Sequence, residues 1–337
     1  MRSTLFGPRR GLVVVAAAAA AAACGRIDFD PAGAPPPDTA GARTLCDLAI
    51  LGDVAALEGA PLALRVVPTA GDVAIVIGTD AGNIYVVRAS SSLVVTSVHL
   101  PLQGGYALRG AGAVGDTLFI QADIGTDAYL KRLDPSWDSY ATMDQGTPAH
   151  VDPPIAPLGT DAVQGIVQSG ELRLRRIDAG GTELATLPPR AAVAASLAPT
   201  TTGVQVASDP GDGTCLLADA ATPGPGTTLS ACALPVFVAG SSASLLLHRD
   251  PIADTTVLRD LTRGTTTPFP RRVARGAVLD GAPWIASADP TTMLSELVDD
   301  TLVESPLPIP TPFDLTPPTG LIWLDGTTLH RGTPCRD

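Results

Sequence analysis

The amino-acid sequence predicts an all-β fold assembled from repeated units of similar length. Short runs rich in Val, Ile, Leu and Thr alternate with clusters of Gly, Pro and Asp, which is the pattern of strands joined by turns. No stretch after residue 43 sustains the 3.6-residue period of a long amphipathic helix. In addition, one unit recurs at a nearly constant interval: a turn, a strand-like run, a loop with Asp or Gly, and a second run.

The repeat length predicts a single β-propeller with seven blades. Four-stranded propeller blades are about 40 to 45 residues long, and the units of this chain open about 41 residues apart. The units open at Asp72, Asp116, Asp161, Gly203, Ser242, Asp280 and Gly320. The last unit reaches residue 337 without its outer strand, which residues 44–51 can supply. The N-terminal strand is therefore expected to close the ring.

The five cysteines divide into one near the N-terminus and four in the predicted body. Cys215 and Cys232 flank the turn-forming segment 222–226 at nearly equal distances, so an antiparallel hairpin places them opposite each other. Cys46 then pairs with Cys335, and this disulfide would staple the closing blade. A rival fold of two β-sandwiches would leave Cys46 and Cys335 in separate domains.

The N-terminal segment has the charged and apolar parts of a secretory signal. Residues 1–10 carry three arginines and no acid, and residues 11–23 are Gly, Leu, Val and Ala only, a run too short to span a bilayer. The sequence Ala-Ala-Ala-Cys-Gly at 21–25 resembles the lipobox of bacterial lipoproteins, in which the cysteine is acylated and exposed by cleavage. The resemblance implies a lipid on Cys24 and an exported protein anchored to a membrane of the bacterial cell envelope.

Three parts of the chain follow from these features. Residues 1–23 are the expected signal peptide, and residues 44–337 are the expected propeller. Between them, residues 24–43 comprise the lipidated cysteine and a linker rich in Pro, Ala and Gly, which has no apolar periodicity.

Residues 76–87, Val-Ile-Gly-Thr-Asp-Ala-Gly-Asn-Ile-Tyr-Val-Val, resemble a blade of the quinoprotein-type propeller repeats. Such repeats occur in quinone-dependent dehydrogenases and in non-catalytic scaffold lipoproteins of the outer membrane. The later units lack the Gly-Asn-Ile-Tyr core. The resemblance therefore implies the fold and leaves the chemistry open.

Composition and motifs argue against several functions. The net charge of −12 repels phosphate backbones, so nucleic acid is not an expected partner. Residues 110–115 match Gly-x-Gly-x-x-Gly, but they lead into a strand-like run, whereas dinucleotide binding needs a following helix. The chain has no Gly-x-Ser-x-Gly, His-Glu-x-x-His or Cys-x-x-Cys, and its histidines, at 99, 150, 248 and 330, are far apart in sequence. We therefore assign no catalytic residue, metal or cofactor from the sequence.

Aspartates recur in the loops between the two strand-like runs of each unit. In a propeller these loops emerge on one face, where aspartates would form an acidic rim for a basic protein surface, a cationic ligand or Ca²⁺. Asp beside Gly or Pro is also ordinary turn chemistry. The candidate ligand-binding residues are Asp80, Asp123, Asp127, Asp209, Asp212, Asp250, Asp254, Asp289 and Asp325.

The sequence favours a lipid-anchored envelope protein that acts as a binding or scaffolding module through its propeller loop face. The expected contacts are a membrane, through the lipid, and an envelope protein with a basic surface. The alternative is an envelope enzyme, a dehydrogenase or a hydrolase, with its active site on the propeller axis. An enzyme of that kind needs titratable side chains that converge in one deep pocket.

Overall fold

The structure, a computed structural model, describes residues 43–336 except 55–56, 225, 270–272, 288–291, 300 and 308. The expected signal peptide, Cys24, the expected linker up to residue 42, and Asp289 lie outside these described residues. Nowhere in the described chain is there a helix long and apolar enough to cross a membrane.

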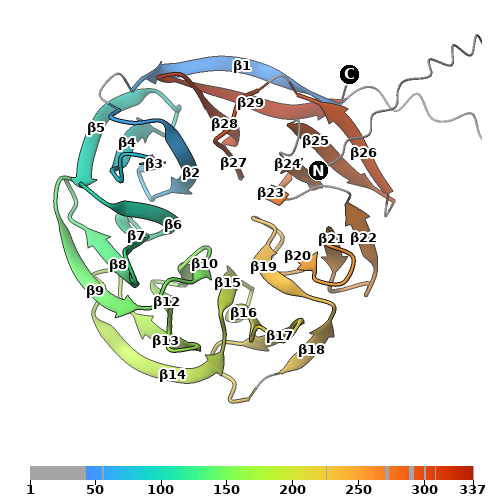
Figure 1. Cartoon of the computed structure of the whole chain (residues 1–337). Coiled ribbons are helices and arrows are strands. Elements are labelled where there is room, and N and C mark those ends of the chain that lie inside the picture. The colour runs from blue at the N-terminus through green and yellow to red at the C-terminus, as the bar shows by residue number, and fades with distance from the viewer. Residues whose placement is uncertain are drawn as a thin grey trace, which may run out of the picture. The chain divides into compact units, whose positions relative to one another are not determined.

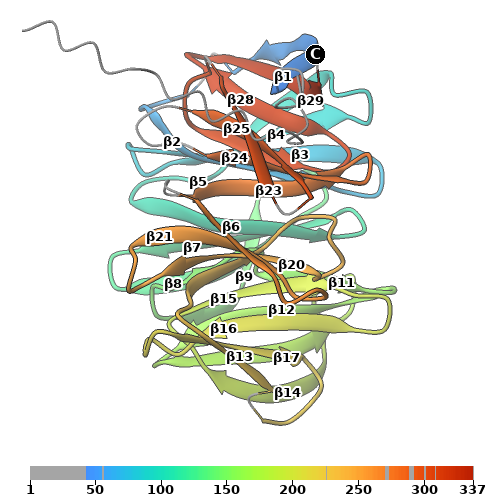
Figure 2. The same cartoon turned by 90° about the vertical axis from the view of Figure 1, so that its right-hand side faces the viewer.

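Seven sheets, antiparallel except for one short parallel pair, stand as blades around a central axis (Figure 1), and Figure 2 shows the same ring from its side. The first three blades are each built from four strands that run outwards from the axis in chain order. Blade 1 contains β2 (Pro61–Pro68), β3 (Asp72–Thr79), β4 (Ile84–Ser90) and β5 (Val95–Leu102). Blade 2 contains β6 (Tyr106–Val114), β7 (Thr117–Ile124), β8 (Asp127–Leu133) and β9 (Tyr140–Gly146). Blade 3 contains β11 (Ile155–Leu158), β12 (Asp161–Gln168), β13 (Glu171–Ile177) and β14 (Glu183–Ala191).

Blades 4 to 6 repeat this order. Blade 4 contains β15 (Ala194–Pro199), β16 (Val204–Asp209), β17 (Thr214–Asp219) and β18 (Thr227–Ser230). Blade 5 contains β19 (Ala233–Phe237), β20 (Leu245–Asp250), β21 (Thr255–Asp260) and β22 (Thr266–Phe269). Blade 6 contains β23 (Val273–Leu279), β24 (Ala282–Ser287), β25 (Met293–Val298) and β26 (Thr301–Pro306). The predicted all-β fold with seven blades is confirmed.

Blade 4 differs from the expected four-stranded unit because it has a fifth strand. The short strand β10 (His150–Val151) pairs in parallel with β15 on the axial side of the sheet. The next residue continues this contact, since the Asp152 N–H donates to the carbonyl of Ala195 at 3.1 Å. The connection from blade 2 to blade 3 is therefore held at the axis.

Blade 7 joins the two ends of the propeller. It contains β27 (Phe313–Thr316), β28 (Gly320–Asp325), β29 (Thr328–Arg336) and, as its outer strand, β1 (Arg43–Asp53). β1 runs antiparallel to β29, and Cys46 is bonded to Cys335 across a separation of 289 residues. This confirms the predicted closure by the N-terminal strand. The second predicted disulfide, Cys215–Cys232, is also present, with a sequence separation of 17.

A buried ion-pair clamp fixes the closing strands of blade 7 to blade 6. Glu296 of β25 is 0% exposed, and it lies 2.9 Å from Nε of Arg43 in β1. Arg336 of β29 donates from Nε to the same carboxylate at 3.0 Å, and the backbone N–H of Arg43 donates to Ser305 Oγ at 2.8 Å. Both outer strands of the closing blade therefore depend on one carboxylate.

The hydrophobic core lies between the blades. The described residues form seven apolar clusters, and each cluster fills the space between one pair of neighbouring blades. The second strand of a blade, such as β3 in blade 1, is buried on both faces, so its sequence is an almost continuous apolar run. The cluster between blades 6 and 7 contains Trp284 and Trp323.

Candidate binding site on the propeller axis

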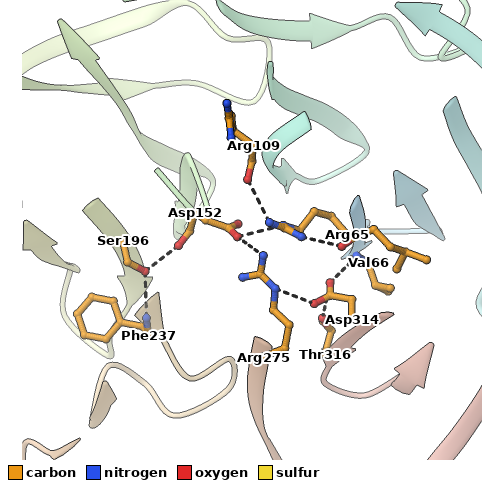
Figure 3. A network of polar contacts seen from close by, with 10 residues as sticks. Arg65, Val66, Arg109, Asp152, Ser196, Phe237, Arg275, Asp314 and Thr316 are labelled. Carbon is orange, nitrogen blue, oxygen red and sulfur yellow. Dashed lines mark hydrogen bonds and ion pairs between the residues drawn. The ribbon is translucent and has the colours of Figure 1, made fainter. Parts of the chain in front are cut away.

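Two arginines and two aspartates meet at the centre of the ring (Figure 3). Oδ2 of Asp152 lies 3.0 Å from Nε of Arg65 and 2.6 Å from Nη2 of Arg275. Nε of Arg275 lies 3.4 Å from Oδ1 of Asp314. These four residues, called the axial network below, come from β2, from the segment between β10 and β11, from β23 and from β27.

Hydrogen bonds extend the axial network to the other blades. Arg65 Nη2 donates to the carbonyl oxygen of Arg109 in β6 at 3.2 Å. Ser196 Oγ of β15 donates to the carbonyl of Asp152 at 2.8 Å and accepts the Phe237 N–H of β19 at 3.0 Å. Contacts at the axis therefore link the inner strands of six blades and the segment that leads into the remaining one, blade 3.

The axial network also bridges the seam where the ring closes. Asp314 in the first strand of blade 7 accepts the backbone N–H of Val66 in blade 1 through Oδ2, at 2.7 Å. Thr316 Oγ1 lies 3.4 Å from the same oxygen. Blades 7 and 1 are thus held together at the axis as well as by the cluster between them.

The glycine-rich segment of blade 2 makes room for this arrangement. Residues 110–114 end β6 and Gly115 begins the turn to β7, so the Gly-x-Gly-x-x-Gly match is a strand and a turn, as predicted. A Cβ on Gly110 would lie 2.6 Å from the carbonyl oxygen of Val151 and 3.3 Å from Oδ1 of Asp152. Only glycine therefore lets the segment after β10 approach the axis this closely.

Burial and mutual pairing both shift the pKa values of the axial groups, and against burial Asp152 and Asp314 raise the pKa of Arg275. Burial raises the pKa of Asp314, against the opposing attraction of Arg275 and Arg65. Burial also lowers the pKa of Arg65, and the positive charge of Arg275 adds to this effect. The two guanidinium groups are balanced by two carboxylates that they contact directly. This mutual pairing favours a structural role for the axial network over acid–base chemistry.

Two cavities lie on the axis, one on either side of the axial network. The first has a volume of about 690 Å³ and is lined by Leu62, Leu234 and Asp254 at its mouth and by Arg65 and Arg275 at its base. The second, of about 480 Å³, shares those two arginines and extends past Asp152 and Asp314 towards the opposite face. The axial network thus divides the axial space, and each cavity is in the size range of ligand sites.

The first cavity, called the turn-face cavity below, opens on the face that carries the predicted aspartates. This turn face is formed by the connections between the second and third strands of the blades. Each candidate aspartate in the described chain lies within one of these connections or at the end of a strand beside it. Of the candidates, Asp80, Asp212, Asp254 and Asp325 are exposed, and Asp127 and Asp250 are half-buried.

Two of the exposed or half-buried aspartates have local turn partners. Asp212 Oδ1 accepts the N–H and hydroxyl of Thr214, and Asp250 accepts the N–H groups of Ile252 and Ala253, which lower its pKa. Turn formation accounts for these contacts. Asp80 instead ties its turn to the segment before β2, because Oδ1 accepts the Ala60 N–H at 2.7 Å.

Two of the candidate aspartates are buried and do not contribute to an exposed rim. Asp123 pairs with Arg109 at 2.5 Å, and burial raises its pKa. Asp209 accepts the N–H of Gly211 at 2.7 Å and that of Leu234 at 3.0 Å. Asp123 is bound by an arginine and Asp209 by a backbone N–H from another blade, and the sequence pattern reveals neither contact.

The described histidines do not gather at one site. His99 lies between Ser97 and Asp138, His330 stacks on Trp323 with ring centroids 5.3 Å apart, and His248 contacts the carbonyl of Arg249. Burial lowers the pKa of His248. Within the described part of the chain, no group of three or more His, Cys, Asp or Glu side chains is placed to hold a metal ion.

The fold and the axis define the chain as a seven-bladed β-propeller in which a network of ion pairs crosses the axis between two cavities. No protein-family model matches the chain, and no curated protein matches its sequence. Among solved structures, it is similar to a chain of the mitotic checkpoint complex, with 14% identity, a TM-score of 0.58 and coverage of 90% of this chain and 96% of that chain. It is also similar to the WD40 β-propeller domain of Doa1, with 12% identity, a TM-score of 0.56 and coverage of 87% and 97%. The Pan2 WD40 domain of Neurospora crassa matches with 13% identity, a TM-score of 0.55 and coverage of 88% and 97%. These likenesses show the propeller fold.

Proposed function

We propose that the protein is a lipid-anchored component of the bacterial cell envelope that binds or scaffolds another envelope protein through its turn face. The observation that carries the binding role is the turn-face cavity, a hollow of about 690 Å³ with a largely apolar lining and a few charged groups. The two disulfides of the body support export, because such bonds persist in oxidising compartments. The lipobox-like residues around Cys24 support the anchor.

The anchor is tested by labelling cells that express the full chain with an alkyne-bearing fatty acid. We expect the label on the wild-type protein and none on Cys24→Ser, because the proposed acylation needs the sulfur of Cys24. Ala22→Gly keeps a small residue before the cysteine and should retain the label. Label that persists on Cys24→Ser, or none on the wild type, contradicts the anchor.

The binding role is tested by placing the photo-cross-linking residue p-benzoylphenylalanine in the full chain at one of two exposed leucines. Leu62 lines the turn-face cavity, and Leu184 lies on the outer strand β14 with a similar exposure, 51% against 69%. Irradiation of cells is expected to yield a discrete adduct from position 62 and none from position 184. Equal adducts from both positions, or none from position 62, would count against binding at the turn face.

A further inference from the structure

We infer that Ser97, His99 and Asp138 form a nucleophilic site that hydrolyses short-chain carboxylic esters. The three side chains are joined by hydrogen bonds in the order that serine hydrolases use, and they lie on blades 1 and 2, outside both axial cavities. The activity is additional to the proposed function and does not involve the turn face. Failure of either one therefore leaves the other intact.

His99 contacts a hydroxyl with one ring nitrogen and a carboxylate with the other. Nε2 lies 2.7 Å from Oγ of Ser97, and Nδ1 lies 2.6 Å from Oδ1 of Asp138. The bond to His99 lowers the pKa of Asp138, so this carboxylate is ionised at neutral pH and can only accept hydrogen bonds. Nδ1 therefore donates to Asp138, which leaves Nε2 of the neutral ring to accept the Ser97 hydroxyl. A base in this tautomer can take the proton of a serine nucleophile.

The site is assembled from two neighbouring blades. Ser97 and His99 are two residues apart in β5, the outer strand of blade 1 (Figure 1), so their side chains point to the same side of the strand. Asp138 lies in the connection between β8 and β9 of blade 2. Ser97 is half-buried, and the side chains of His99 and Asp138 are 14% and 68% exposed. The site is therefore accessible to a substrate from solvent.

The connection between β8 and β9 is held in place by Asp134 and Trp137. Asp134 Oδ2 accepts the Ser139 hydroxyl at 2.7 Å, and its Oδ1 accepts the Asp138 N–H at 3.2 Å. Trp137 is buried, and its ring meets the His99 ring edge-on, with the centroids 6.4 Å apart. These contacts fix Asp138 relative to the imidazole, and catalytic groups need such fixed positions.

A positive charge lies on the same face of blade 1 as the Ser97 hydroxyl. Arg88 of β4 is directly opposite Ser97 in the sheet register, so both side chains lie on that face. The Arg88 guanidinium lies 4.1 Å from the ring centroid of Trp137, donates from Nη2 to the Pro135 carbonyl at 2.7 Å, and lies 3.6 Å from Asp72 through Nε. A cation fixed in this way can stabilise the negative charge that develops on the ester carbonyl oxygen during attack.

The reaction is an ester hydrolysis in two steps. Ser97 Oγ attacks the ester carbonyl carbon as its proton passes to His99 Nε2, the C–O bond to the alcohol breaks, and the alcohol leaves with that proton. Water then attacks the acyl group on Ser97 and gives a proton to Nε2, and the carboxylic acid is released as Oγ recovers the proton. Asp138 accepts from the imidazolium in both steps. One ester and one water thus give one acid and one alcohol, with no oxidation or reduction.

The inference is tested on the full chain in detergent with a fluorophosphonate probe, which bonds to an activated serine oxygen and releases fluoride. Mass spectrometry is expected to locate the probe on Ser97, and the rate of p-nitrophenyl acetate hydrolysis should fall about tenfold or more in Ser97→Ala. His99→Gln should lose both the label and the hydrolysis, because the nucleophile then lacks its base. No label on the wild type, label on another residue, or unchanged hydrolysis by either variant overturns the inference.

A nearby serine provides the matched control. Ser91 is exposed in the connection between β4 and β5, and Ser91→Ala is expected to keep the label and the hydrolysis rate of the wild type. Asp138→Asn leaves Ser97 and His99 in place but removes the ionised acceptor of Nδ1, so the rate should fall about tenfold or more. Circular dichroism checks that each variant keeps its β-structure. Slower hydrolysis by Ser91→Ala, or an unchanged rate in Asp138→Asn, would contradict the roles assigned to these residues.

Discussion

Replacing Asp152 with Asn is expected to lower the free energy of unfolding by about 3 to 5 kcal/mol, the usual cost of breaking a buried ion pair from one side. One oxygen of Asp152 contacts both Arg65 and Arg275, so its loss leaves two guanidinium groups sharing the remaining carboxylate of Asp314. Urea unfolding, followed by the fluorescence of Trp137, Trp284 and Trp323, measures the change. Trp284 and Trp323 lie between blades 6 and 7 and so report on the integrity of the ring.

An exposed ion pair provides the matched control for Asp152. Asp254 pairs with Arg249 at the surface, where both side chains are about half exposed, so Asp254→Asn should cost about 1 kcal/mol or less. Removing Arg275 together with Asp152, as Asp152→Asn with Arg275→Met, should cost less than the sum of the single changes because the two groups are in contact. A cost for Asp152→Asn no larger than that for Asp254→Asn would show that the axial network does not hold the ring.

Replacing Cys46 and Cys335 together by Ser is expected to lower the free energy of unfolding by roughly 5 to 6 kcal/mol in the chain-entropy treatment, because the bond closes a loop of 289 residues. The bond restricts the conformational freedom of nearly the whole propeller chain in the unfolded state. In the folded ring, β1 remains paired with β29 and bound to Glu296, so the variant is expected to keep its native β-structure at low temperature. Circular dichroism measures the native β-structure at low temperature, and the loss of the same signal on heating measures the change in stability.

The second disulfide is the control for the first. Cys215 and Cys232 close a loop of only 17 residues, so their replacement by Ser should cost about 3 kcal/mol in the same treatment. A larger loss for the Cys46–Cys335 variant indicates that the ring unfolds as one unit. Equal losses, or a smaller loss at Cys46–Cys335, would mean that β1 detaches locally before the blades separate.

The fold could be predicted because its determinants are local and repeated. Turns such as those at Asp116 and Asp161 recur with the period of one blade, and each is followed by a strand that is buried on both faces. Closure could be predicted as well, since the last unit lacked a strand and Cys46 and Cys335 remained as the pair to join. The extra strand β10 escaped prediction because two residues carry no periodic signal.

The axial site could not be predicted in the same way. Arg65, Asp152, Arg275 and Asp314 are separated by tens of residues or more, and only ring closure brings them together. The available signal was a charge within an apolar strand, as in Phe313-Asp314-Leu315, because an isolated charge in a buried strand needs a partner. The turn aspartates were predicted to lie on one face, but sequence alone could not separate exposed Asp254 from buried Asp209.

The closing strand β1 also determines on which face of the ring the described chain begins. β1 begins at Arg43 opposite Arg336 and ends at Asp53 opposite Thr328, next to the β28–β29 connection on the turn face. Arg43 therefore lies on the far face, and the strand crosses the full thickness of the ring before the chain reaches the mouth of the cavity. The described chain therefore begins on one face of the ring, and the turn-face cavity opens on the opposite face.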